Sequence, residues 1–444
     1  MCTFEAEAVN LLSNLIQIDT TNPPGNELAA VQYLAAIARQ NDLDVEIIET
    51  APGRGNLLVK LPGHNPDLPP LILLSHLDVV PADPVAWQIP PFSGQVQDGI
   101  IWGRGAVDTK QLTVMQFMAL LQLKRSGLFP QRDVILAATA DEECGSRLGL
   151  AALLETHGRL FRDADVVSEG GGFPIRVGNQ TIYLCESGQK GPCTVRFSCP
   201  KQAGGNPYFP NLNGVQAASE LILRLEGYRW PGEIPEMTRR LLERLATAAG
   251  ITESLPPDDL LAQLAGQISP ALHKVLTAMT QNTMAVTVWK GGRRSNLPGF
   301  DSELLADVRL LPGVGRGDLE ERLNELTAGL PVAWELIKYQ PGYEASAESA
   351  LFQALAGALE NRLPGAQVAP FLSSGASDGR LLQSHGARVY GFSPVLLEDM
   401  TFDQAITMVH GVDERISVAS LIFGTEVLYA AVVSLCQEKM NEKP

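Results

Sequence analysis

The sequence predicts an α/β fold, in which a mixed, mostly parallel sheet is sandwiched by helices. Helical and strand-like segments alternate along the first 170 residues, and the strand-like segments are continuous apolar runs of the kind that is buried on both faces. The helix predicted at residues 109–124 is apolar at nine of the twelve positions from Leu112 to Leu123. A helix that is apolar on nearly every side is a buried one, so the fold is expected to have a large core.

The elements of this fold follow one another in a regular order. Apolar spacing predicts helices at residues 4–16 and 27–40, separated by the breaker Asn-Pro-Pro-Gly at 22–25. Short apolar runs of strand length then occupy residues 43–48, 56–61, 71–75, 134–139 and 164–168, with a helix at 148–157 before the last of them. Such alternation indicates helices packed around a largely parallel sheet.

From about residue 191 the pattern changes to that of a smaller domain. The predicted order is strand, helix, strand, strand, helix, strand, at residues 194–198, 215–225, 285–289, 303–311, 318–326 and 332–339. This is the split-βαβ order of a two-layer, ferredoxin-like α+β domain. A Pro-rich segment at about 231–280 is predicted to be a helical insertion within it.

After Pro341 and Gly342 the α/β pattern resumes, with a helix at 350–361, a strand at 389–392 and a helix at 417–436. A chain of 444 residues is too long for one ordinary domain. We therefore expect residues 1–190 and 344–444 to form one α/β domain, and residues 191–343 to form a smaller domain inserted into it.

Composition excludes several classes of function. The 50 Asp and Glu residues outnumber the 34 Lys and Arg residues, and the net charge of −16 weighs against binding to nucleic acid or to an anionic membrane. No uncharged apolar run of about 18 residues and no signal peptide is evident, so we expect a soluble, cytoplasmic protein. The six cysteines form no C-x-x-C pair and are expected to be free thiols.

Polar side chains follow three of the predicted strands at the point where each strand ends. His76 and Asp78 come after one strand, Glu142 and Glu143 after the next, and Glu169 after a third. Each has an ordinary alternative: a structural histidine, a turn cap, a solvated acidic pair or a loop residue. Because ligands of open α/β sheets bind beyond the carboxyl ends of strands, three such ends together favour one assembled site.

Carboxylates and imidazoles in combination suit Zn²⁺ or a similar metal ion. Two more segments offer such groups: Asp108 stands just before the buried helix, and His410 lies in a polar turn late in the chain. A site for two metal ions needs a carboxylate between ions that are about 3.5–4 Å apart, and a base for the attacking water.

Three motifs resemble those of the M20 metallopeptidases, a family that includes glutamate carboxypeptidases, aminoacylases, acetylornithine deacetylase and succinyl-diaminopimelate desuccinylase. They are HLDVVP at 76–81, GRGAVDTK at 103–110 and DEE at 141–143. The resemblance implies a zinc-exopeptidase-like fold and two divalent metal ions, most commonly zinc, with cobalt or manganese as alternatives. It makes His76 and Glu169 ligands of one ion, Glu143 and His410 ligands of the other, and Asp108 the bridge between them.

The same resemblance implies the remaining roles around the metal ions. Glu142 would be the general base that activates water, and Asp78 would orient His76 through its far ring nitrogen. The Asp108-Thr109 peptide bond is expected to be cis. The reaction would be hydrolysis of an amide, in a small peptide or an N-acyl amino acid, next to a free carboxylate, by a monomer or by a homodimer formed through the smaller domain.

Matches in the smaller domain and after it imply the substrate contacts. Asn296 and Arg309 would hold the substrate carboxylate, although an ordinary surface ion pair is an alternative for Arg309, and Gly375 lies in a Gly-rich loop that would contact the substrate. One departure is that Gly205 stands where the family has a histidine that steadies the oxyanion; Asn206, Tyr208 or Asn211 are candidate substitutes. This departure motivates a second hypothesis, a metal-binding or regulatory protein with weakened catalysis.

Overall fold

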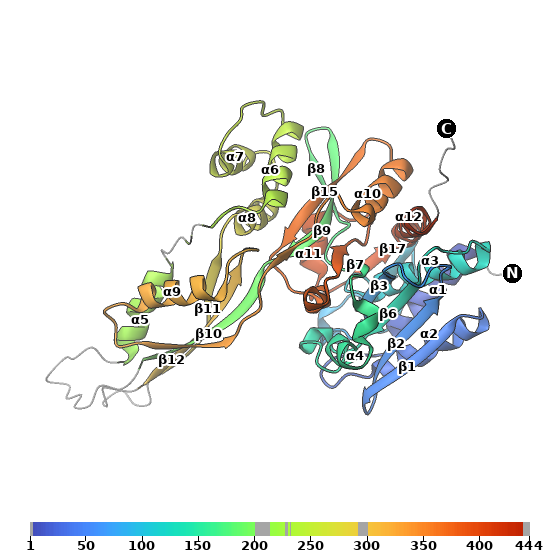
Figure 1. The fold of residues 1–444 in the computed structure, drawn as a ribbon, viewed down its shortest axis with the longest axis horizontal. Helices are drawn as coiled ribbons and strands as arrows, with labels where there is room; N and C mark the ends of the chain where they lie inside the picture. The colour runs from blue at the N-terminus through green and yellow to red at the C-terminus, as the bar shows by residue number, and fades with distance from the viewer. Residues whose placement is uncertain (1–2, 200–213, 227–229, 231, 292–300, 438–444) are drawn as a thin grey trace.

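The computed structural model describes residues 3–199, 214–226, 230, 232–291 and 301–437. These residues form a sheet of ten strands, a sheet of four strands and a small sheet of three strands. In Figure 1 the ten-stranded sheet and its helices occupy the right of the molecule, and the four-stranded sheet extends to the left. The predictions for Asn296, Gly205, Asn206, Tyr208 and Asn211 concern residues that lie outside the described ranges.

The ten-stranded sheet is mixed, as predicted. Its main path runs β1-β2-β6-β3-β7-β16-β9-β14, and β8 and β15 also pair with β9. The neighbours β6, β3, β7 and β16 are parallel, whereas β1 and β2 are antiparallel to their neighbours at one margin. The strands are β1 (Asp44–Ala51), β2 (Arg54–Leu61), β3 (Leu71–His76), β6 (Val134–Thr139), β7 (Asp165–Ser168), β8 (Pro174–Val177), β9 (Gln180–Gln189), β14 (Tyr343–Glu344), β15 (Ala366–Ser373) and β16 (Arg388–Gly391).

Helices cover both faces of this sheet, because successive strand residues point to opposite sides. On β2, Leu57 and Val59 enter one core and Leu58 the other. The first core is covered by α1 (Phe4–Gln17), α2 (Glu27–Gln40), α3 (Lys110–Ser126), α10 (Ala350–Arg362) and α12 (Val418–Cys436). The second is covered by α4 (Leu150–His157) and the 3₁₀ helices η3 (Gly158–Phe161) and η4 (Asp378–His385).

Helix α12 is the one described helix that is long and apolar enough to cross a membrane by length and composition alone, with a mean hydropathy of 1.9. Half of it is buried inside the protein, where it packs against α3 and α10 in the first core. Central helices of large protein cores have the same length and apolar composition, so this helix is weak evidence for a membrane span.

The four-stranded sheet forms a separate two-layer unit with the predicted order of elements. Its strands β10 (Gly191–Cys199), β11 (Thr283–Gly291), β12 (Ser302–Leu310) and β13 (Ala333–Lys338) are antiparallel and lie in the order β11-β12-β10-β13. Helices α5 (Gly214–Glu226) and α9 (Arg316–Thr327) pack on one face. The other face is free of helices among the described residues and is called here the open face.

Three helices that lie within the sequence of the smaller domain pack against the larger sheet. Helices α6 (Glu236–Ala248), α7 (Pro257–Leu264) and α8 (Pro270–Met279) share a core with β8, β9 and β15, and Figure 1 shows α6 beside β8 and β15. Their apolar side chains, such as Leu241 and Leu245, are buried in the same core as Leu184 of β9 and Phe371 of β15. The helical insertion thus belongs by packing to the larger unit.

A single residue, Lys190, separates β9 of the larger sheet from β10 of the smaller one. Its buried ammonium group donates hydrogen bonds to the carbonyl oxygens of Ala278 (2.9 Å) and Gln281 (2.8 Å) and to the hydroxyl of Thr283 (3.1 Å). The junction between the two sheets is therefore joined to the end of α8 and the start of β11.

The three-stranded sheet brings the late chain beside the loop before α3. Its strands are β4 (Val96–Gln97), β5 (Ile100–Trp102) and β17 (Arg415–Ser417), and β17 pairs with β5. The segment between α11 (Phe402–Met408) and β17 therefore lies next to the segment between β5 and α3. Both segments carry predicted site residues.

Candidate metal centre

The three strands whose ends carry the predicted site residues are neighbours in the larger sheet. Strand β3 pairs in parallel with β6 on one side and with β7 on the other. His76 is the last residue of β3, Glu143 lies in the turn after β6, and Glu169 directly follows β7. Parallel strands end at the same edge, so these side chains converge as the sequence predicts.

The five predicted metal ligands form two groups that share Asp108. His76 Nε2 lies 3.2 Å from Asp108 Oδ1 and 3.3 Å from Glu169 Oε2. His410 Nε2 lies 3.3 Å from Asp108 Oδ2 and 3.1 Å from Glu143 Oε2. Each oxygen of Asp108 therefore faces a different imidazole, and each group offers one nitrogen and two carboxylate oxygens that lie within 4.8 Å of one another.

The negative charge of the carboxylates in this cluster favours the binding of cations. Burial alone would lower the pKa of His76, but Glu169 and Asp108 outweigh it and raise the pKa well above its usual range. Hydrogen bonds to Asp108 and Glu143 raise the pKa of His410 to about 10. Three carboxylates therefore hold two protonated imidazoles when no other cation is bound.

The donor set fits two divalent ions of the zinc type. Imidazole nitrogens and carboxylate oxygens are the ligands such ions use, and each group offers three of them, the number that catalytic zinc sites take from the protein. In addition, Glu143 Oε1 is buried and has no hydrogen-bond partner among the described residues. A buried carboxylate oxygen without a partner is costly, and a cation would remove that cost.

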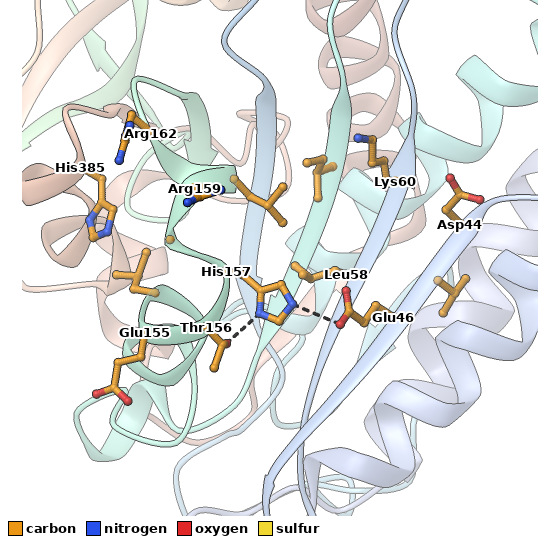
Figure 2. Close-up of a pocket in the computed structure, with 15 residues that line it drawn as sticks. Asp44, Glu46, Leu58, Lys60, Glu155, Thr156, His157, Arg159, Arg162 and His385 are labelled. Atoms are coloured by element: carbon orange, nitrogen blue, oxygen red, sulfur yellow. Dashed lines mark hydrogen bonds and ion pairs between the residues drawn. The ribbon is translucent and has the colours of Figure 1, made fainter. Parts of the chain in front are cut away.

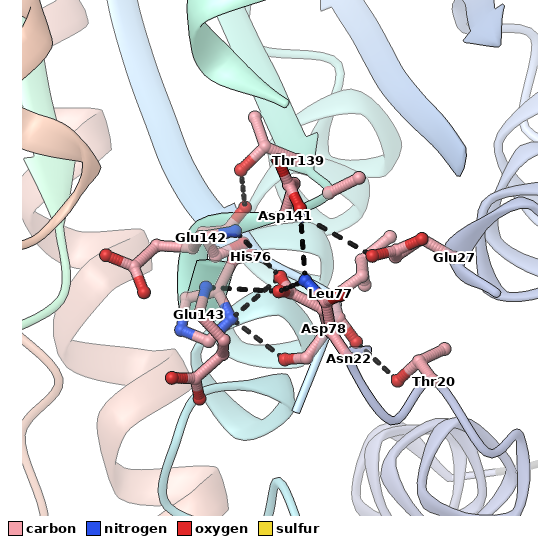
Figure 3. Close-up of polar contacts among 12 residues, drawn as sticks. Thr20, Asn22, Glu27, His76, Leu77, Asp78, Thr139, Asp141, Glu142 and Glu143 are labelled. Atoms are coloured by element: carbon pink, nitrogen blue, oxygen red, sulfur yellow. Dashed lines mark hydrogen bonds and ion pairs between the residues drawn. The ribbon is translucent and has the colours of Figure 1, made fainter. Parts of the chain in front are cut away.

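Asp78 contacts His76 of one group and the backbone of Glu143 of the other (Figure 3). It accepts hydrogen bonds from the backbone N–H groups of Glu142 and Glu143, each at 3.1 Å, and from the side-chain amide of Asn22 at 2.9 Å. His76 Nδ1 lies 2.9 Å from the backbone oxygen of Asp78 and 3.5 Å from its carboxylate. Asp78 thus holds the turn after β6 and the ring of His76 in one arrangement.

Glu142 points away from Asp78 on the same side as Glu143 (Figure 3). Glu142 lines a pocket beside the two groups of candidate ligands. Burial together with the Glu169 carboxylate raises the pKa of Glu142 well above the usual range. Arg380 Nη1 lies 3.8 Å from Glu142 Oε1, beyond hydrogen-bond distance. A carboxylate with a raised pKa beside a metal centre suits general-base chemistry near neutral pH.

A buried ion-pair network that the sequence analysis missed supports the same turn. Arg54 makes two hydrogen bonds of 2.7 Å to Glu27, and its Nη2 lies 3.0 Å from Asp141 Oδ1. Asp141 in turn accepts a hydrogen bond from the backbone N–H of Leu148 at 2.9 Å. These partners come from α2, β2 and the turn after β6, so spacing along the chain does not reveal the network.

Glu414, also missed, organises the loop that carries Asp108. Its fully buried carboxylate accepts hydrogen bonds from the backbone N–H groups of Gly105 (3.0 Å), Val107 (2.6 Å) and Asp108 (2.8 Å), and from Arg104 Nη1 (2.7 Å). The next peptide bond, Asp108-Thr109, is cis, as the family resemblance implied. The only signal in the sequence was the position of Glu414 four residues after His410.

A pocket of about 520 Å³ opens beside the two groups and extends to the smaller domain. Gly375 lines it, and so does Arg309 from β12 of the open face. Arg309 Nε and Nη2 bind both oxygens of Asp307, at 2.7 and 3.0 Å, whereas Nη1 is buried without a partner in the described part of the chain. The ion pair considered as an alternative therefore exists, and Nη1 of Arg309 has no hydrogen-bond partner among the described residues.

A larger hollow of about 720 Å³ lies elsewhere, between β1, β2 and α4 (Figure 2). His157 contacts Glu46 there, at 3.1 Å, and its other ring nitrogen contacts Thr156. The lining mixes charges of both signs and includes neither group of metal ligands. The candidate metal ligands Asp108, Glu143, Glu169 and His410 line the smaller pocket instead.

The model of the M20/M25/M40 peptidase family matches residues 72–434, which include both groups of ligands. The chain belongs to this family. Among curated M20 relatives, the N-fatty-acyl-amino acid synthase/hydrolase PM20D1 of Xenopus tropicalis is 27% identical over 375 residues, covering 81% of this chain and 71% of the relative. Aminoacylase-1 of Sus scrofa is 24% identical, covering 95% of this chain and 94% of the relative.

Solved M20 structures have the same fold. The M20 metallo-carboxypeptidase Sso-CP2 of Sulfolobus solfataricus superposes with a TM-score of 0.71 at 19% identity, covering 97% of this chain and 99% of that structure. Human carnosine dipeptidase 1 superposes with a TM-score of 0.63 at 15% identity, covering 97% of this chain and 96% of that structure. The protein is accordingly an M20-type metallohydrolase.

Proposed function

We propose that this M20 protein hydrolyses an amide bond next to a free carboxylate, in a small peptide or an N-acyl amino acid, with two divalent metal ions. The observation that carries the proposal is Asp108, whose two oxygens face His76 and His410, each 3.2–3.3 Å away. Zinc is the metal we propose, with cobalt or manganese able to occupy the same ligands. The relative named as an N-fatty-acyl-amino acid synthase/hydrolase supports the N-acyl amino acid part of this substrate class.

The two ions would supply Lewis acidity toward the amide carbonyl and an acidic water. Glu142 would take a proton from that water at its carboxylate and pass it to the nitrogen of the leaving amine. Asp78 would keep the turn that carries Glu142 in place, and the free Nη1 donor of Arg309 would bind the substrate carboxylate.

The proposal is tested by a panel of dipeptides and N-acyl amino acids, assayed with zinc, cobalt or manganese and again after a chelator. Each substrate is paired with its C-terminal amide, which lacks the negative charge but keeps the scissile bond. We expect turnover of the acids, slower turnover of the amides, and loss of both after chelation. Equal rates for acid and amide would contradict the requirement for a carboxylate.

Glu142→Gln tests the base, because it removes the proton acceptor at nearly constant volume. We expect a loss of about 10²–10⁴-fold in kcat with two metal equivalents retained. Glu155→Gln, at an exposed position on α4, is the matched control. A protein that binds two ions but turns over no substrate of the panel would instead support the hypothesis of weakened catalysis that Gly205 motivates.

A further inference from the structure

The open face of the smaller sheet carries a row of polar side chains across three strands. Thr194 on β10 is paired with Lys338 on β13 and with Asp307 on β12, so the three side chains stand side by side on one face. Arg309 follows two residues after Asp307 and points to the same face. All four line the pocket that the metal ligands also line.

The cations of this face differ in how they are paired. Arg196 contacts Glu335 at 2.7 Å and Glu303 at 3.5 Å, outside the pocket lining. Arg309 is held by both oxygens of Asp307. The side chain of Lys338 forms no ion pair or hydrogen bond with any described residue.

Two other cationic side chains lie near Lys338. Partial burial and the guanidinium groups of Arg380 and Arg309 lower the pKa of Lys338, which means that like charges lie near its ammonium group. Among the described residues of the smaller sheet that line the pocket, Asp307 is the only one with a carboxylate, and Arg309 forms an ion pair with it. In a protein with a net charge of −16, this part of the pocket carries an excess of positive charge.

We propose that Lys338 binds a second carboxylate of the substrate, so that the preferred leaving group is an acidic amino acid. The α-carboxylate would meet the free Nη1 donor of Arg309, and the side-chain carboxylate would meet the ammonium group of Lys338, two strands away on the same face. This inference rests on the proposed function for the bond that is cleaved, and it adds the side chain that is selected.

The test compares N-acetylglutamate with N-acetylglutamine, which have nearly the same size and differ in one negative charge. Their binding to the Glu142→Gln variant is measured by calorimetry, because that variant is expected to bind without turnover. At low ionic strength we expect the acid to bind about three- to tenfold more tightly. Lys338→Met should abolish this preference, Lys338→Glu should reverse it, and added salt should weaken it.

Lys290→Met is the matched control, since Lys290 lies on the same open face beside Glu303 but outside the pocket lining. It should leave the preference unchanged. Equal binding of the two ligands, or a preference that survives Lys338→Met, overturns the inference. An equal loss for both ligands in Lys338→Met also overturns it, because Lys338 would then bind the shared α-carboxylate. Failure of the wild type to hydrolyse any amide would count against the proposed function alone.

Discussion

The backbone N–H of Asp108 donates a 2.8 Å hydrogen bond to the carboxylate of Glu414, a residue 306 positions later in the chain. Glu414 follows His410 by four residues, so one short segment provides a candidate ligand and also fixes the loop that carries the bridging candidate. The second metal group therefore depends on the docking of the late chain against the loop before α3.

Glu414→Gln is expected to weaken metal binding by about 10–100-fold, because an amide group offers one acceptor oxygen to three backbone N–H donors and Arg104. Metal content after equilibrium dialysis at graded free zinc measures the effect. Glu398→Gln, at an exposed position, should bind metal like the wild type. Two equivalents bound with unchanged affinity by Glu414→Gln would refute the role of Glu414.

Asp78→Asn should lower kcat/KM by about 10–100-fold while the fold is retained. The new amide keeps one acceptor oxygen, so its NH2 group would face either the N–H of Glu142, or the N–H of Glu143 and the amide of Asn22, and the turn would shift. Steady-state kinetics with the best substrate of the panel, alongside the exposed control Asp67→Asn, measure the loss. Wild-type kinetics for Asp78→Asn would show that the turn does not need the carboxylate.

The metal-free protein should lose stability as the pH rises. The pKa of His410 is raised from about 6.5 in the unfolded chain to about 10 in the folded protein. Its stabilising contribution is therefore fully present below pH 6.5 and is lost as the pH rises through 10. We expect the melting temperature of the metal-free protein to fall over this range, and to fall less in His410→Asn. An identical fall in both proteins would assign the effect to other groups.

Arg54→Met should destabilise the fold by about 3–5 kcal/mol, because it leaves the carboxylates of Glu27 and Asp141 buried without their counter-ion. Denaturant unfolding measures this loss in the metal-free protein. The exposed pair of Arg125 with Glu7 is the control, and Arg125→Met should cost no more than about 1 kcal/mol. Equal costs for the two variants would mean that the network contributes little beyond packing.

The convergence of three candidate ligands, His76, Glu143 and Glu169, could be predicted from the sequence because each lies at the end of an apolar strand. Strands β6, β3 and β7 are continuous apolar runs, so their ends, and the polar residues just after them, were evident. Strand β9 was missed because it buries Glu186, Ser187 and Gln189, which an apolar-run criterion takes for a loop. Strand β15, which contains Pro370, was missed as well.

The residues that support the ligands could not be predicted for a different reason. Glu414 and Arg54 look like surface charges in the sequence, since neither lies in an apolar pattern. They are buried only because their partners arrive from distant parts of the chain, such as the N–H groups of residues 105–108 and the carboxylate of Glu27. Likewise, α6–α8 were assigned by their place in the chain, whereas their apolar faces contact β9 and β15.

The one-residue junction at Lys190 joins the two strands, β9 and β10, that both line the pocket. Strand β10 begins at Gly191, and its second residue, Pro192, pairs with Arg309. The positively charged part of the pocket therefore starts directly beyond the junction. Because the ammonium group of Lys190 fastens this junction to α8 and β11, the separation between the metal ligands and Arg309 is set by a short, anchored connection. Under the proposed function, this separation would select substrates by the distance from the scissile amide to the free carboxylate that Arg309 binds, before any side chain is recognised.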